Sequence, residues 1–111
     1  MSDAIIDRTV FRELQDSAGA DFVVELVDTF AEEAPQMLDE LRAALAAGAA
    51  DRFRRAAHSL KTNANTFGAT ALGVQARELE LGGLPAGCAG IDALQSLFES
   101  ALAALKEIAR G

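Results

Sequence analysis

The sequence predicts an all-α protein, an antiparallel up-down four-helix bundle with a short extra helix at the N-terminus. Of its 111 residues 50% are hydrophobic but only 5% are aromatic, and alanine and leucine dominate, a composition that favours packed helices over sheets. Along most of the chain the apolar residues recur at steps of three or four, which is the spacing of one helix face. Helices of this kind can bury those faces only against one another.

Size and charge restrict the possible partners. We take residues 1–111 as one domain. The formal net charge of −7 argues against nucleic acid or an anionic membrane as a partner.

The single cysteine, Cys88, cannot form an internal disulfide, and neither a targeting signal nor a membrane-spanning stretch is present, so we expect a cytoplasmic protein. A monomer is expected because the bundle would consume each apolar face.

The first predicted helix runs from Asp7 to about Ser17 and ends near Gly19. A long helix follows, with Asp21 as its expected cap and Gly48 at its end. Its predicted inward residues are Val23, Leu26, Phe30, Ala34, Met37, Leu41 and Leu45.

Pro35 lies within the long helix, and two readings of it are open. The apolar stripe keeps its phase across the proline, which favours one kinked helix in which Pro35 faces water. The alternative is a break at Ala34 that would divide the segment into two helices.

Three further helices complete the prediction. One runs from about Ala50 to Phe67 and stops at Gly68, and the next starts at once and ends at Gly82-Gly83. A loop over residues 82–90 leads to the last helix, Ile91 to Ala109. The expected inward residues are Phe53, Ala57, Leu60, Ala64 and Phe67, then Ala69, Leu72, Ala76 and Leu79, and finally Leu94, Phe98, Ala101, Leu105 and Ile108.

The only histidine, His58, is predicted to face outward among cations. On a helical wheel it lies about 140° from Phe53, whose direction defines the core face. Residues 52–67 contain four basic side chains and no acidic one, in a chain that is acidic overall. Cations around an exposed imidazole favour an anionic ligand, although a merely solvated helix face would have the same charges.

Phosphoryl transfer is the chemistry that suits His58 best. A neutral imidazole offers a nucleophilic nitrogen at neutral pH, and Lys61 or Arg54, one helical turn away, could stabilise phosphoryl oxygens. A metal site is disfavoured, because the neighbours one turn away are Arg54, Arg55, Lys61 and Thr62.

The run from His58 to Ala69, His-Ser-Leu-Lys-Thr-Asn-Ala-Asn-Thr-Phe-Gly-Ala, resembles the signature of histidine-containing phosphotransfer (Hpt) domains. The segments Arg54-Arg55-Ala56-Ala57, Glu32-Glu33-Ala34-Pro35 and Glu78-Leu79-Glu80 resemble the family too, as do Leu72 and Ala76, so the resemblance covers nearly the whole chain. It implies that His58 accepts the phosphoryl group, that Lys61 stabilises the phosphate, and that Gly68 ends their helix.

Thr62 departs from the glycine that the family often has at this position. Its bulk would narrow the approach of a partner, or its hydroxyl could serve the ring or the phosphate. We interpret Arg54, Arg55, Thr62 and Asn65 as a partner-docking surface.

The resemblance implies a phosphorelay carrier that exchanges phosphate with receiver domains of response regulators or hybrid histidine kinases. No ATP-binding motif is present, so we expect no autokinase activity, and neither a cofactor nor a metal of the chain's own. Magnesium is expected on the receiver. The alternative is a helical adaptor that docks on a receiver or a histidine kinase without chemistry.

Overall fold

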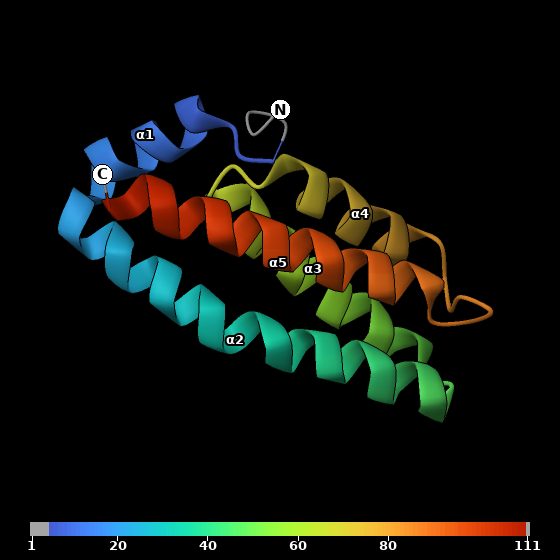
Figure 1. The fold of residues 1–111 in the computed structure, drawn as a ribbon. Helices are drawn as coiled ribbons and strands as arrows, with labels where there is room; N and C mark the ends of the chain where they lie inside the picture. Colours follow the sequence, from blue (N-terminus) through green and yellow to red (C-terminus); the bar gives the residue numbers. More distant parts are fainter. Residues whose placement is uncertain (1–4, 111) are drawn as a thin grey trace.

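The computed structural model describes residues 5–110, and over this range it contains five helices and no strand (Figure 1). The prediction of an all-α protein is therefore confirmed. Of the predicted domain, residues 1–4 and 111 lie outside the described residues. The helices are α1 (Arg8–Ala18), α2 (Ala20–Ala47), α3 (Ala50–Thr66), α4 (Thr70–Leu81) and α5 (Ala89–Arg110).

The four longer helices pack in a closed order around one core. Helix α2 contacts α3 and α5, and α4 contacts the same two helices on the other side (Figure 1). The short helix α1 contacts α2 and α3 and lies at one end of the molecule. Each of these four helices therefore packs against two of the other three and keeps one face away from the core.

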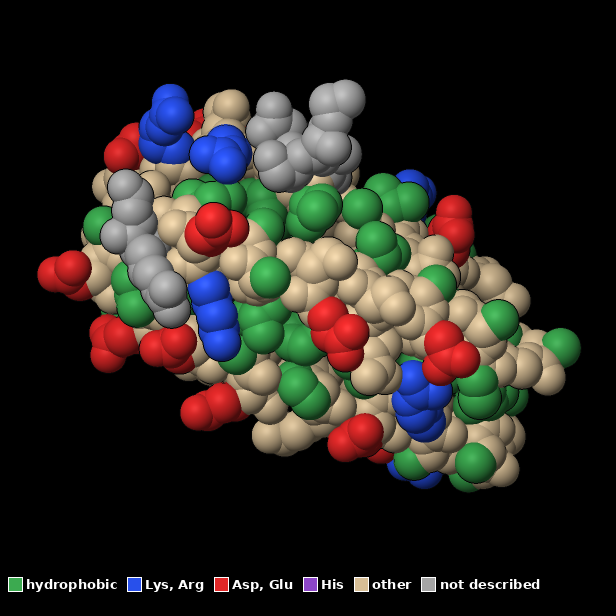
Figure 2. Space-filling model, viewed as in Figure 1, with side chains coloured by type: hydrophobic (Ala, Val, Ile, Leu, Met, Phe, Trp, Pro, Cys, Tyr) green, Lys and Arg blue, Asp and Glu red, His purple; other side chains and the backbone are tan. Residues whose placement is uncertain are grey.

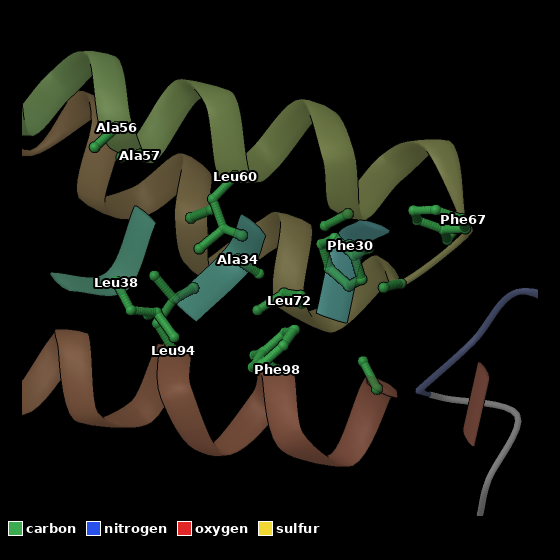
Figure 3. Close-up of a cluster of buried hydrophobic side chains, with 14 of the residues drawn as sticks. Phe30, Ala34, Leu38, Ala56, Ala57, Leu60, Phe67, Leu72, Leu94 and Phe98 are labelled. Carbon is green, nitrogen blue, oxygen red and sulfur yellow. The ribbon is translucent and has the colours of Figure 1, made fainter. Parts of the chain in front are cut away.

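The core is mainly aliphatic, and three phenylalanine rings contact one another near its middle, one pair tilted and the other edge to face. Phe30 of α2 lies with its ring centroid 5.1 Å from that of Phe67 and 5.3 Å from that of Phe98, at distances typical of favourable aromatic pairs (Figure 3). All the inward residues predicted for α3 and α4 are buried, and so are those of α5 except Ile108, which is half-buried. The faces of the last three helices were thus predictable from spacing alone.

Helix α2 is continuous through Pro35, which is exposed, so the reading as one helix is confirmed. Its buried face is wider than predicted, because α2 packs between α3 and α5. Val27, Leu38 and Ala44 are fully buried, and Leu26, Met37 and Leu45 lie half-buried at the edges.

Several predicted helix ends need correction. Asp7 caps α1, accepting hydrogen bonds from the backbone N–H groups of Thr9 and Val10. Asp21 is not the cap of α2, because that helix already begins at Ala20, which places Asp21 inside its first turn. Helix α5 begins at Ala89, so the loop before it is shorter than predicted.

A tight turn at Gly68 joins α3 to α4 and sets the register between them. Gly68 has φ +78°, a left-handed conformation that glycine adopts without steric cost. The backbone N–H of Asp7 donates a hydrogen bond of 2.7 Å to the Gly68 carbonyl. The segment before α1 is therefore fastened to the turn that aligns α3 with α4.

Within residues 5–110, no helix combines the length and the apolar character that crossing a membrane requires.

Candidate functional site

His58 lies on the solvent side of α3. Its side chain is 56% exposed, because the opposite side of the same helix supplies Phe53, Ala57 and Leu60 to the core. The outward orientation predicted from the helical wheel is therefore correct. No histidine is visible on the face shown in Figure 2, where α5 lies in front of α3.

A carboxylate from α4 lies between His58 and Lys61. The Oε2 atom of Glu80 lies 2.7 Å from Nδ1 of His58, and its Oε1 atom lies 2.7 Å from Nζ of Lys61. The Glu80 side chain is only 11% exposed, whereas that of Lys61 is 23% exposed. One carboxylate thus holds both of the residues that the motif singled out.

The contact with Glu80 fixes the tautomer of the neutral imidazole. An ionised carboxylate can only accept a hydrogen bond, so Nδ1 must carry the proton and donate it. The lone pair then resides on Nε2, the nitrogen on the other side of the ring. In an exposed side chain this arrangement provides a nucleophile that needs no further deprotonation.

The contacts with Lys61 and His58 also change the acidity of Glu80. Hydrogen bonding from Lys61, and next from His58, lowers the pKa of the Glu80 carboxyl below its usual 4.5, although partial burial acts in the opposite direction. Glu80 therefore stays ionised throughout the neutral range, and its bond to His58 persists there.

The lowered pKa predicts an acid-dependent loss of stability. A group whose pKa is lower in the folded than in the unfolded state stabilises the fold above the unfolded value, and this contribution disappears as pH falls through the folded value. Glu80→Gln is therefore expected to be less stable than wild type at neutral pH, with a difference that shrinks below about pH 4.5. Urea unfolding of both proteins across this range measures it. A difference that stays constant down to full protonation would contradict the prediction.

The cations of α3 are compensated more fully than the local sequence indicated. Arg54 and Arg55 both pair with Asp51, at 2.8 and 2.6 Å, on their own helix. Arg52 makes two hydrogen bonds to Glu40 of α2. Both arginine side chains beside Asp51 remain more than half exposed, so a partner can still reach them. The basic face is therefore a set of ion pairs whose acids come from outside residues 52–67.

Thr62 and Asn65 are exposed, but both have local contacts. The Thr62 hydroxyl donates a hydrogen bond of 3.1 Å to the backbone carbonyl of His58. It therefore contacts the backbone of α3 and not the imidazole ring. Asn65 lies against Gly73 of α4, where a Cβ atom would collide with its side-chain oxygen. Asn65 thus also helps to pack α3 on α4.

Two hollows flank the exposed face of α3. The larger, of about 480 Å³, lies between α2 and α3 and has Met37 and Ala56 among its lining residues, together with Glu33, Gln36, Glu40, Arg52, Arg55 and Ser59. The smaller, of about 280 Å³, lies between α3 and α4 and includes Asp51, Arg54 and Glu80. Across residues 5–110, no cluster of three or more histidine, cysteine or acidic side chains could hold a metal ion.

The family model for the Hpt domain matches residues 25–107, from α2 through most of α5. The chain belongs to the Hpt domain family. Hpt domains interact with receiver domains in phosphorelays, so membership assigns this Hpt protein to phosphorelay signalling. No curated protein and no solved structure matches the chain.

Glu80 is the site residue of this Hpt protein to which sequence reasoning assigned no role. Its segment contributed to the family resemblance, but the link to His58 depends on how α3 and α4 align. His58 and Glu80 lie at equal distances along the chain from Ala69, and so do Asn65 and Gly73. Pairing residues symmetrically about the turn would have predicted both contacts.

Proposed function

We propose that this Hpt protein carries a phosphoryl group on Nε2 of His58 between aspartates of receiver domains of response regulators or hybrid histidine kinases. The observation that supports this most strongly is the bond from Nδ1 to Glu80, which leaves the other ring nitrogen as an exposed nucleophile. The signature around His58 and membership of the Hpt family support the same function.

The transfer step needs no proton to move. Nε2 attacks the phosphorus of an aspartyl phosphate, the N–P bond forms, and the P–O bond breaks with its electron pair going to the aspartate. The ring becomes cationic because Nδ1 keeps its proton, and the charge of Glu80 stabilises that cation. Transfer to a second receiver is the reverse process. Magnesium, which we expect on the receiver, would stabilise phosphoryl oxygens from the other side.

We assign phosphate stabilisation to Lys61 and partner docking to Arg54, Arg55, Thr62 and Asn65. Lys61 is one turn from His58 and is held on the same side by Glu80. The exposed guanidinium groups of Arg54 and Arg55 suit the acidic active site of a receiver. Thr62 lies one helical turn after His58, and its hydroxyl donates a hydrogen bond to the His58 carbonyl. Its side chain therefore borders the path by which a partner would approach the imidazole.

We further infer an antiparallel up-down bundle of α2–α5 that acts as a cytoplasmic monomer, without a cofactor or metal of its own. The closed order of helix contacts supports the bundle. The exposed free thiol of Cys88 is compatible with a reducing compartment. The net charge of −7 makes nucleic acid and anionic membranes unfavourable partners.

A transfer assay tests the proposed function. Purified receivers are phosphorylated, incubated with the full chain and separated, and the label on the chain is examined. We expect a label that acid removes and alkali does not, which is the behaviour of a phosphoramidate. Stoichiometric binding to receivers with no label would instead indicate the non-catalytic adaptor and would reject the carrier function.

Lys61→Ala is expected to slow transfer up to about fivefold while leaving the fold intact. A single partly exposed charge contact contributes about 1 kcal/mol or less, which corresponds to that factor in rate. The measurement is the initial rate of label transfer from a phosphorylated receiver, with circular dichroism as the check on folding. An unchanged rate would remove Lys61 from the mechanism.

A further inference from the structure

Glu80 is shared between the phosphoryl acceptor and the cation that would hold the phosphoryl group. Each carboxylate oxygen lies 2.7 Å from one of these partners, Nδ1 of His58 and Nζ of Lys61. With 11% of its side chain exposed, Glu80 has little access to water that could replace either contact. Lys61 is therefore already occupied before any phosphoryl group arrives.

We propose that Glu80 is a positioning residue that keeps the phosphoryl group on His58 short-lived, so that it is passed on rather than stored. It does so with one oxygen that holds the proton on Nδ1 and with another that competes for Lys61. The inference rests on the carrier function proposed above and adds to it the lifetime of the carried group.

The first effect concerns the leaving group. When water or a receiver carboxylate attacks the phosphorus, the N–P bond breaks and its electron pair returns to Nε2. If Nδ1 carries a proton, neutral imidazole leaves; if it does not, the much poorer leaving group imidazolate must depart. In hydrolysis the phosphoryl group takes the oxygen of water, and a proton of that water goes to solvent. A carboxylate on Nδ1 favours the protonated, labile form.

The second effect concerns Lys61. An ammonium group that neutralises phosphoryl oxygens in the carried state stabilises that state relative to the products. The ion pair with Glu80 opposes this, because Lys61 must share its charge between the carboxylate and the phosphoryl group. Both effects of Glu80 therefore shorten the lifetime of the phosphorylated protein.

Most of the other charges near His58 are paired with one another. Asp51 lies in the hollow between α3 and α4 beside Glu80 and holds Arg54 and Arg55. The charged residues that line the larger hollow, between α2 and α3, are Glu33, Glu40, Arg52 and Arg55. Of these, Glu40 and Arg52 pair with each other. Among the ion pairs that the structure describes, only Glu80 places a carboxylate on the imidazole.

The experiment follows loss of label after the receiver has been removed. Wild type and Glu80→Gln are labelled by a phosphorylated receiver and incubated over a range of pH. Glutamine keeps an oxygen that accepts the Nδ1 proton but removes the charge. Because the charge that favours the protonated ring is gone, we expect the pH profile of decay to move toward lower pH, and decay at neutral pH to become slower by up to about tenfold.

Two further comparisons separate the effects. Glu78→Gln removes the same charge from an exposed position of the same helix and should leave both decay rate and pH profile unchanged. Lys61→Gln should accelerate decay more in the Glu80→Gln background than in wild type, because Lys61 is released there. A Glu80→Gln protein with the wild-type decay rate and pH profile would overturn the inference.

A measurement on the unphosphorylated wild-type protein keeps the inference independent of any variant. Nitrogen chemical shifts of the His58 ring are expected to report the tautomer with the proton on Nδ1. A ring that carries its proton on Nε2 would overturn the inference even if His58 accepts phosphate. Absence of label on wild type and variants alike, with the expected tautomer present, would instead reject the carrier function.

Discussion

His58→Gln is expected to abolish phosphoryl acceptance and to leave the fold intact. Glutamine is polar and of similar length, but its amide nitrogen has no available lone pair and cannot attack phosphorus. Because the His58 side chain is 56% exposed, its loss should change the free energy of unfolding by no more than about 0.5 kcal/mol. The measurement is the transfer assay, run beside urea unfolding of the same protein.

Binding supplies the control for this variant. His58→Gln should still form a complex with the receiver, since Arg54, Arg55 and the two flanking hollows are unchanged. Loss of label with retained binding would separate the chemical role of the ring from a docking role. A variant that takes up as much label as wild type would show that another residue accepts the phosphoryl group.

Gly68→Ala is expected to lower the free energy of unfolding by about 2–4 kcal/mol, by two additive causes. The residue has φ +78°, where a side chain is strained. An added Cβ would also lie 2.6 Å from the backbone oxygen of Asp7 and 3.1 Å from Cβ of Val10. Relieving that collision requires moving the segment before α1, in which the N–H of Asp7 donates a hydrogen bond to the Gly68 carbonyl. Urea unfolding measures the loss.

Gly48→Ala is the matched control for the strained conformation alone. Gly48 has φ +65°, but nothing lies within 4 Å of a Cβ added there. Its replacement should cost about 1 kcal/mol, the conformational part without the collision. Equal losses of unfolding free energy for the two variants would mean that the collision with Asp7 adds nothing to the cost of Gly68→Ala.

Features that depend on a single helix were predictable from the sequence. The inward face of α3 and the outward direction of His58 follow from one rotation angle per residue, which neighbouring helices do not alter. The continuity of α2 through Pro35 followed in the same way, from the unbroken phase of its apolar residues. The widened face of α2 did not, because it depends on contacts with both α3 and α5.

Features that depend on two helices were not predicted. Residues 52–67 contain no acidic side chain, but Glu40 and Glu80 reach Arg52 and Lys61 from other helices. Asp51, one residue before this segment, pairs with Arg54 and Arg55. The assignment of Asp21 as a cap failed for a local reason, since α2 already begins at Ala20 and its N-cap is Gly19, which has φ +93°.

The hydrogen bond between Asp7 and Gly68 affects where this protein can be truncated. The family match starts at residue 25, yet Ile6 is 1% exposed and Phe11, in α1, is equally buried. A fragment trimmed to the match would uncover the apolar side chains beneath α1 and remove the hydrogen bond that the Asp7 N–H donates to the Gly68 carbonyl. The packed core therefore extends beyond the residues that the family model matches, and expression boundaries should be drawn upstream of Ile6.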